Sequence, residues 1–98
     1  MKEETKQVSL QIQLDEQTAQ GIYANLVIVQ HSSSEFILDF VFINPGQPVA
    51  KVRSRIIMSP EHTKRLQKAL SENLAHYESR FGEIKLPNMG PQFKMPVQ

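Results

Sequence analysis

The chain has no cysteine, and its four glycines lie far apart, at positions 21, 46, 82 and 90. Without cysteine it has no disulfide, no thiolate nucleophile and no zinc site with sulfur ligands. The scattered glycines exclude the glycine-rich loop that holds phosphates in many nucleotide-binding proteins. Several common kinds of catalytic and cofactor site are therefore ruled out.

Long apolar runs are also missing. Residues 1–7 are polar and no apolar stretch follows them, so they are unlike a signal peptide. No segment is long enough to cross a bilayer as a helix. We predict a cytoplasmic protein with no membrane partner.

Neither sign of charge dominates, since 11 Lys and Arg against 10 Asp and Glu give a net charge of +1. Dedicated nucleic-acid binders usually carry a strong basic excess, so this balance argues against that class. A length of 98 residues allows one domain, which buries only about 60–65% of its unfolded surface. We place the domain at residues 7–84, between a flexible arm (1–6) and a flexible tail containing proline and glycine (85–98).

The most informative stretch is a predicted hairpin. Residues 36–43, FILDFVFI, are mostly apolar on both alternating sides, so this strand should be central and covered on both faces. Residues 44–48, NPGQP, separate it from a second β-rich run at 49–58. A five-residue loop places Asp39 opposite Arg53 as a cross-strand ion pair.

Two more strands precede this hairpin. Residues 8–14 alternate apolar and polar side chains, which is typical of a half-buried edge strand. Asp15 and Gly21 favour one capped helical turn before the next strand, at 22–30. A loop at residues 32–34 then keeps Val29 opposite Ile37 and Val27 opposite Asp39.

A helix follows the strands. Ser59 is a favoured N-cap and Pro60 a favoured first helical residue, and Gly82 suits the end. One apolar stripe runs along about 20 residues between them: Leu66, Ala69, Leu70, Leu74, Tyr77 and Phe81. The predicted fold class is α+β, a four-stranded antiparallel β-meander followed by one long C-terminal α-helix. That helix should pack on the sheet face that carries Phe36, Leu38, Phe40 and Phe42.

Four stretches together resemble a known family: residues 18–25 (TAQGIYAN), 31–40 (HSSSEFILDF), 51–62 (KVRSRIIMSPEH) and 64–70 (KRLQKAL). It is the family of short bacterial proteins called domain of unknown function 3467, and the resemblance covers about residues 8–84. The resemblance implies a fold and carries over no catalytic residue. Separately, the predicted topology is similar to that of the export chaperone SecB, an analogy of fold alone.

The histidines do not predict a catalytic or metal site. His62 and His76 are about 21 Å apart along one helix and cannot share an ion within a chain. His31 lies beside three serines, but Asp39 lies several residues down the sheet from them, which disfavours a Ser–His–Asp site. We predict no catalytic residue, no metal, no cofactor and no enzymatic activity.

The basic residues form two clusters. Lys51, Arg53 and Arg55 make a ladder on one sheet face and are candidates for phosphate contacts. The second cluster lies on the helix, on the opposite side of the monomer, so the two make no single groove. An ion-paired or solvated face explains the ladder more simply, and weak nucleic-acid binding remains the alternative.

A single helix can cover only one face of the sheet, which leaves the other exposed. The candidate oligomer interface on that face is Tyr23, Val27, Val29, Ile37, Asp39, Val41, Ile43 and Ile57, and Val49 is predicted to lie on the same face. A patch of this size exceeds the few hundred Å² usual for monomers. We therefore predict a homodimer or larger homo-oligomer that acts as a non-catalytic protein-interaction module. The sequence does not identify the protein that this module binds. The alternatives are a nucleic-acid-associated protein and a SecB-like chaperone that binds unfolded clients.

Overall fold

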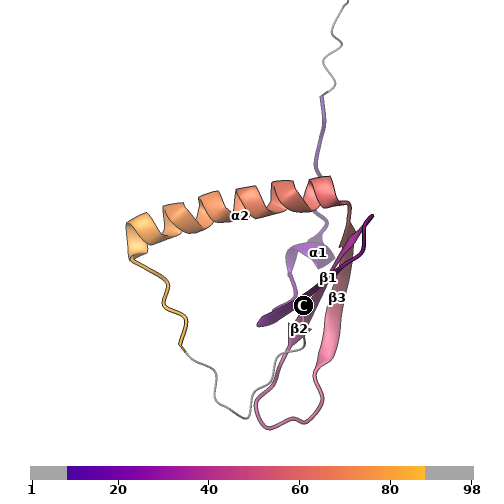
Figure 1. The fold of residues 1–98 in the computed structure, drawn as a ribbon, viewed down its shortest axis with the longest axis vertical. Helices are drawn as coiled ribbons and strands as arrows, with labels where there is room; N and C mark the ends of the chain where they lie inside the picture. Colours follow the sequence, from indigo (N-terminus) through magenta and orange to yellow (C-terminus); the bar gives the residue numbers. More distant parts are fainter. Residues whose placement is uncertain (1–8, 88–98) are drawn as a thin grey trace, which may run out of the picture.

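The computed structural model describes residues 9–87. Its elements are α1 (Glu16–Ala19), β1 (Leu26–His31), β2 (Phe36–Phe42), β3 (Lys51–Met58) and α2 (Pro60–Phe81). The strands form one open antiparallel sheet in the order β1-β2-β3 (Figure 1). The α+β class is confirmed, with three strands in this part of the chain rather than four. The predicted arm (1–6), Val8 and the tail from residue 88 lie outside the described residues.

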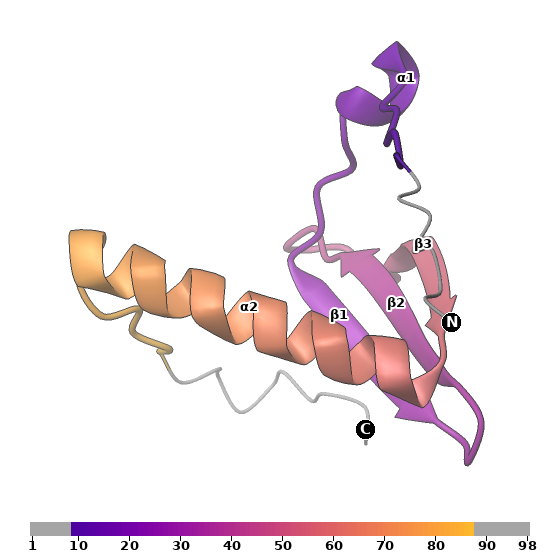
Figure 2. The ribbon, with the colours of Figure 1, turned by 90° about the horizontal axis from the view of Figure 1, so that it is seen from above.

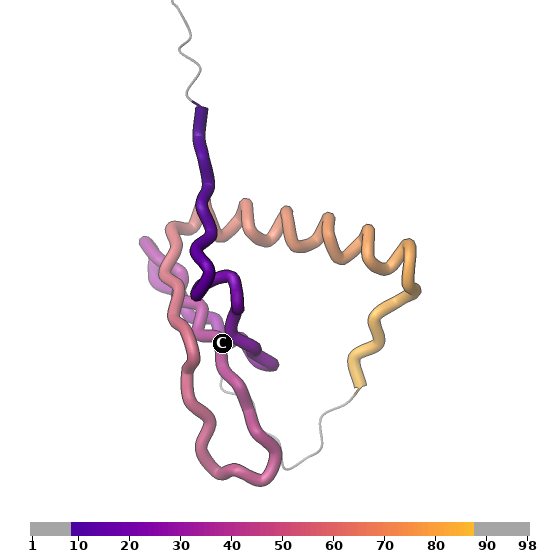
Figure 3. The backbone as a smooth tube through the Cα atoms, turned by 180° about the vertical axis from the view of Figure 1, so that it is seen from behind, coloured from indigo at the N-terminus to yellow at the C-terminus, as the bar shows by residue number. Residues whose placement is uncertain are grey.

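The predicted first strand does not pair with the sheet. Leu10, Ile12 and Leu14 are 81%, 89% and 69% exposed. Residues 9–14 run away from the sheet, past the level of α2 (Figure 3). The alternating pattern indicates that residues 9–14 can pair as a strand. To pair within the same chain, they must also be brought back alongside β1 by the residues that connect the two. The turn after α1 instead directs residues 9–14 away from β1.

The next strand starts four residues later than predicted, at Leu26 rather than residue 22. The side chain of Asn25 takes the place of a backbone partner. Its Nδ2 donates to the Ile43 carbonyl at 2.9 Å, and its Oδ1 accepts from the Ile43 N–H at 2.8 Å. These two side-chain hydrogen bonds close the ladder between β1 and β2 at this end. The preceding residues Ile22 and Tyr23 remain exposed.

The predicted register between β2 and β3 is wrong. Asp39 lies opposite Arg55 rather than Arg53, and a β-bulge at Arg53 separates the pairs Phe40–Ser54 and Val41–Val52. The connection is longer than five residues, because β2 ends at Phe42 and β3 begins at Lys51. Pro45 and Pro48 lie in this connection and have no N–H to donate, which shortens the ladder at this end.

The register between β1 and β2 differs from the prediction by one residue. Val29 lies opposite Leu38 and Val27 opposite Phe40. The turn has four residues, 32–35, because the Ser32 hydroxyl accepts from the N–H groups of Ser34 and Glu35, both at 3.3 Å. A shift by one residue moves the side chains of β1 to the other face of the sheet.

The helix α2 has the predicted ends. The Ser59 hydroxyl accepts from the His62 N–H at 3.2 Å, Pro60 is the first helical residue, and Gly82 adopts a φ of 96° at the end. The predicted packing on the sheet is not found. All residues of α2 are at least partly exposed, and the helix projects from the end of β3 (Figure 2). Only one residue, Ser59, joins β3 to α2, and the helix leaves the sheet at this point.

Candidate functional site: an uncovered apolar surface

The registers divide the sheet into two faces. Directly opposite residues project to the same side. The phenylalanine face carries Phe36, Leu38 and Phe40 of β2, Val27 and Val29 of β1, and Ser54 and Ile56 of β3. The aspartate face carries Ile37, Asp39 and Val41, with Leu26, Ile28, Arg55 and Ile57 beside them.

The predicted oligomer interface is therefore split between the two faces. Ile37, Asp39, Val41 and Ile57 share the aspartate face, whereas Val27 and Val29 lie on the phenylalanine face. Tyr23 packs edge-on against Phe42, with ring centroids 5.9 Å apart. Ile43 follows β2 and is half-buried, and Val49 is exposed in the connection before β3. Since β1 is apolar on both sides, its pattern does not distinguish the two registers.

Asp39 is a buried charge held by one partner. Arg55 Nε donates to Oδ1 at 2.7 Å and Nη2 donates to Oδ2 at 2.8 Å, a bidentate pair. Asp39 is only 5% exposed, whereas more than half of the Arg55 side chain is open to solvent. The hydrogen bonds from Arg55 hold the pKa of the Asp39 carboxyl below its usual value, against desolvation, which raises it. In return, the same bonds raise the pKa of Arg55.

The basic ladder does not act as one group. Arg55 is committed to Asp39, and the bulge turns Arg53 toward Phe42, with its guanidinium carbon 5.9 Å from the ring centroid. Lys51 is exposed at the start of β3. One of the three candidate phosphate contacts is thus neutralised by a neighbouring carboxylate, and a second lies over an aromatic ring.

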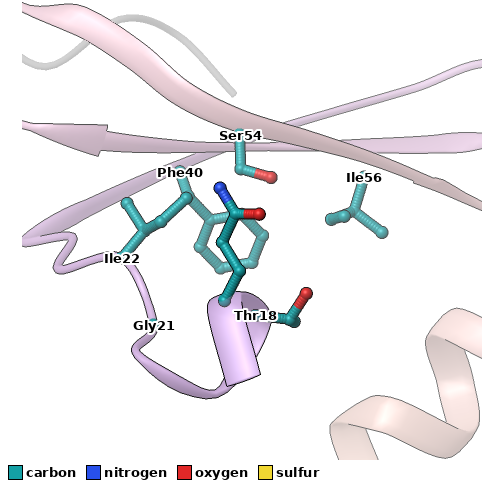
Figure 4. Close-up of a pocket in the computed structure, with 7 residues that line it drawn as sticks. Thr18, Gly21, Ile22, Phe40, Ser54 and Ile56 are labelled. Atoms are coloured by element: carbon teal, nitrogen blue, oxygen red, sulfur yellow. The ribbon is translucent and has the colours of Figure 1, made fainter. Parts of the chain in front are cut away.

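The phenylalanine face contains a hollow that the sequence did not predict. It has a volume of about 510 Å³ and lies between the sheet and α1 (Figure 4). Its lining is Gln17, Thr18, Gly21, Ile22, Phe40, Ser54 and Ile56. Asp15 caps α1 by accepting from the Thr18 N–H, and Gly21 turns the chain with a φ of 77°. The cap and the glycine were predicted, but nothing in the pattern indicated that α1 would overhang Phe40.

The apolar stripe of α2 is a second uncovered surface. Leu66, Leu70, Leu74, Tyr77 and Phe81 are all exposed. The opposite side of the helix carries Glu61, Lys64, Arg65 and Lys68, with an ion pair of 3.1 Å between Arg65 and Glu61. The helix is therefore amphipathic in the way that the sequence predicts, but its apolar side faces solvent.

The structure does not bring His31 to Asp39. His31 stacks on Phe36, with ring centroids 5.3 Å apart, and lies three positions along β1 from Ile28, the residue opposite Asp39. Among residues 9–87, no group of three or more histidine and acidic side chains is arranged to hold a metal. The described residues offer apolar contact surface, one ion pair on the sheet and one on α2.

None of the described helices is both long enough and apolar enough to span a bilayer. No curated protein and no solved structure matches the chain. A family model does match, over residues 1–86, and its description is "Protein of unknown function (DUF3467)". The match covers most of the 98 residues, including every strand and helix described above, and the chain belongs to this family.

Proposed function

We propose that the protein is a non-catalytic interaction module of the bacterial cytoplasm that works as a homodimer or larger homo-oligomer. One observation carries the proposal. Within residues 9–87, the only buried hydrophobic residues are Leu38 and Val41, while the stripe of α2 and much of the sheet are exposed. A single copy therefore has almost no core.

The free-energy cost of ordering the chain supports the same conclusion. Ordering the chain costs about 1–2 kcal/mol per residue in backbone entropy alone, which only extensive burial can offset. Burying a leucine or phenylalanine side chain contributes roughly 1.5–3 kcal/mol. A second copy supplies the missing contact surface.

The two uncovered surfaces of one chain complement each other in a pair of copies. The stripe from Leu66 to Phe81 spans about 22 Å at 1.5 Å per residue. The seven residues of β2 span about 23 Å at 3.3 Å per residue. Since α2 does not cover its own sheet, its apolar stripe is free to pack on the phenylalanine face of another copy. Tyr23, Val27 and Val29, from the predicted interface, lie on this side of the sheet.

The test is light scattering coupled to size exclusion of the full chain, from low micromolar to high micromolar concentration. We expect a mass of at least twice 11.2 kDa. A mass of one chain at all concentrations would overturn the proposal. If the oligomer also binds a permanently unfolded polypeptide, the SecB-like alternative gains support, and salt-sensitive binding of DNA or RNA would favour the nucleic-acid alternative.

A further inference from the structure

Residues Ser9–Leu14, the donor segment, have the properties of a strand without a partner. Leu10, Ile12 and Leu14 alternate with Ser9, Gln11 and Gln13, and the segment contains no charge, proline or glycine. None of its N–H groups donates to the backbone of another described residue. Six uncharged residues with period-two alternation and three exposed large apolar side chains indicate a segment suited to strand pairing.

The sheet has two edges, and they differ. The β3 edge carries Lys51, Arg53 and Arg55 and is interrupted by the bulge at Arg53. Charged side chains and bulges are the usual protection of an edge against pairing with another chain. The β1 edge, with the sequence LVIVQH, has no acidic residue, lysine, arginine or proline, and its register with β2 is regular. It is also six residues long, the length of the donor segment.

The local structure directs the donor segment away from its own β1. The cap of α1 by Asp15 and the positive φ of Gly21 set the turn that follows the segment. Asn25 then fixes the start of β1 through its two hydrogen bonds to Ile43. The segment consequently leaves the sheet on the side where α2 begins (Figures 1 and 3).

We propose that the donor segment of one copy adds to the free edge of β1 of a second copy, and that the exchange is reciprocal. This inference rests on the proposed homo-oligomer and specifies how two copies join. Backbone hydrogen bonds along the edge supply the pairing, and the alternate apolar side chains cover one sheet face. Two identical contacts related by a two-fold axis close the assembly as a dimer. Each sheet then has four strands, the fourth from its partner.

The first test is NMR on the full chain, in a sample mixed from ¹³C-labelled and unlabelled copies. Isotope-filtered NOEs report only contacts between different copies. We expect such NOEs between Leu10–Leu14 and Leu26–His31. We also expect amide exchange in both segments to slow as the protein concentration rises.

The second test compares two proline variants by light scattering and dilution. Ile12→Pro removes an N–H and blocks pairing in the middle of the donor segment. It should raise the dissociation constant of the dimer at least tenfold. Glu16→Pro is the matched control, because Glu16 is the first residue of α1 and the preceding Asp15 is already extended, with a ψ of 162°. It should leave the constant unchanged.

The outcomes separate the two proposals. A wild-type chain that stays monomeric overturns the proposed function and the exchange with it. A wild-type dimer that lacks the filtered NOEs overturns the exchange alone, and so does an Ile12→Pro dimer as tight as wild type. Concentration-independent protection of the donor segment would assign it to its own sheet and would also overturn the exchange.

Discussion

The central strand β2 and the helix α2 are both regular and predictable elements, but they differ in what surrounds them. In β2, Leu38, Asp39 and Val41 are buried by neighbours on both sides. In α2, no residue is buried along 22 residues. The strand obtains its burial from the chain itself, whereas the helix has an apolar side that the chain does not use. This difference is the basis on which we propose an assembly of more than one copy.

The largest expected effect comes from placing a charge on the apolar side of α2. Leu70 is 55% exposed in the single chain, where Leu70→Glu should cost no more than about 0.5 kcal/mol. In an oligomer that covers α2, it should cost about 3 kcal/mol and split the assembly, because an unpaired charge is buried. Urea unfolding and light scattering measure the two effects.

Ala75→Glu is the control for this substitution. It adds the same charge to the same helix, on the side away from the stripe, and Ala75 is exposed. If both variants behave like wild type, α2 is a solvated helix and the contrast with β2 has no consequence for assembly.

Val41→Glu is a poor probe of the interface, because Val41 is already buried within one copy.

The ion pair of β2 predicts how stability depends on pH. Because the folded pKa of Asp39 is lowered by Arg55, the pair stabilises the fold above about pH 4 and is lost as the pH falls through the folded pKa. Asp39→Asn should lower the melting temperature by several degrees at pH 7, and the difference from wild type should shrink as the pH falls through the folded pKa of Asp39.

The same experiment distinguishes the observed partner from the predicted one. Arg55→Gln should reproduce the effect of Asp39→Asn on the pH dependence of melting. Arg53→Gln should leave that dependence as in wild type, because Arg53 lies over Phe42. An acid profile changed by Arg53→Gln and not by Arg55→Gln would favour the predicted register.

A smaller effect is expected at the start of α2. Ser59→Ala removes the acceptor for the His62 N–H and should cost about 1 kcal/mol of unfolding free energy. The urea midpoint measures it. Ser71→Ala, at an exposed position inside the same helix, should cause no loss. Equal midpoints for the two variants would contradict a cap at Ser59.

The smallest effect concerns nucleic acid. We expect binding no tighter than about 10⁻⁴ to 10⁻⁶ M at physiological salt, the ordinary non-specific range. The double variant Lys51→Glu, Arg53→Glu, which leaves the Arg55–Asp39 pair intact, should therefore change little in a binding titration. Sub-micromolar binding that this variant abolishes would restore the basic ladder as a functional site.

The local parts of the fold could be predicted from the sequence. Ser59, Pro60 and Gly82 define the ends of α2 through short-range chemistry, and Asp15 does the same for α1. The strand registers could not be predicted from the sequence, because they depend on the lengths of the connections between strands. The Ser32 turn changed the partners of β1, and the bulge at Arg53 changed those of β3.

The candidate surface could be predicted in composition but not in arrangement. Val27 and Val29 of the predicted interface lie on the phenylalanine face, whereas Ile37, Val41 and Ile57 lie on the aspartate face. Their division between two faces follows from a shift of one residue, which β1 tolerates because both its sides are apolar. The hollow under α1 depends on where Gly21 directs the chain. The spacing of apolar residues in the sequence does not predict that direction.

The single residue between β3 and α2 has a mechanical consequence. A helix of 22 residues is about 33 Å long, and it is attached to the sheet at one end only. A rotation of about 10° at Ser59 would displace Phe81 by about 6 Å, since displacement grows with distance from the pivot. The Ser59 cap and Pro60 stiffen this pivot. Small changes in backbone angle at one residue are thus amplified along α2 into large displacements of its far end.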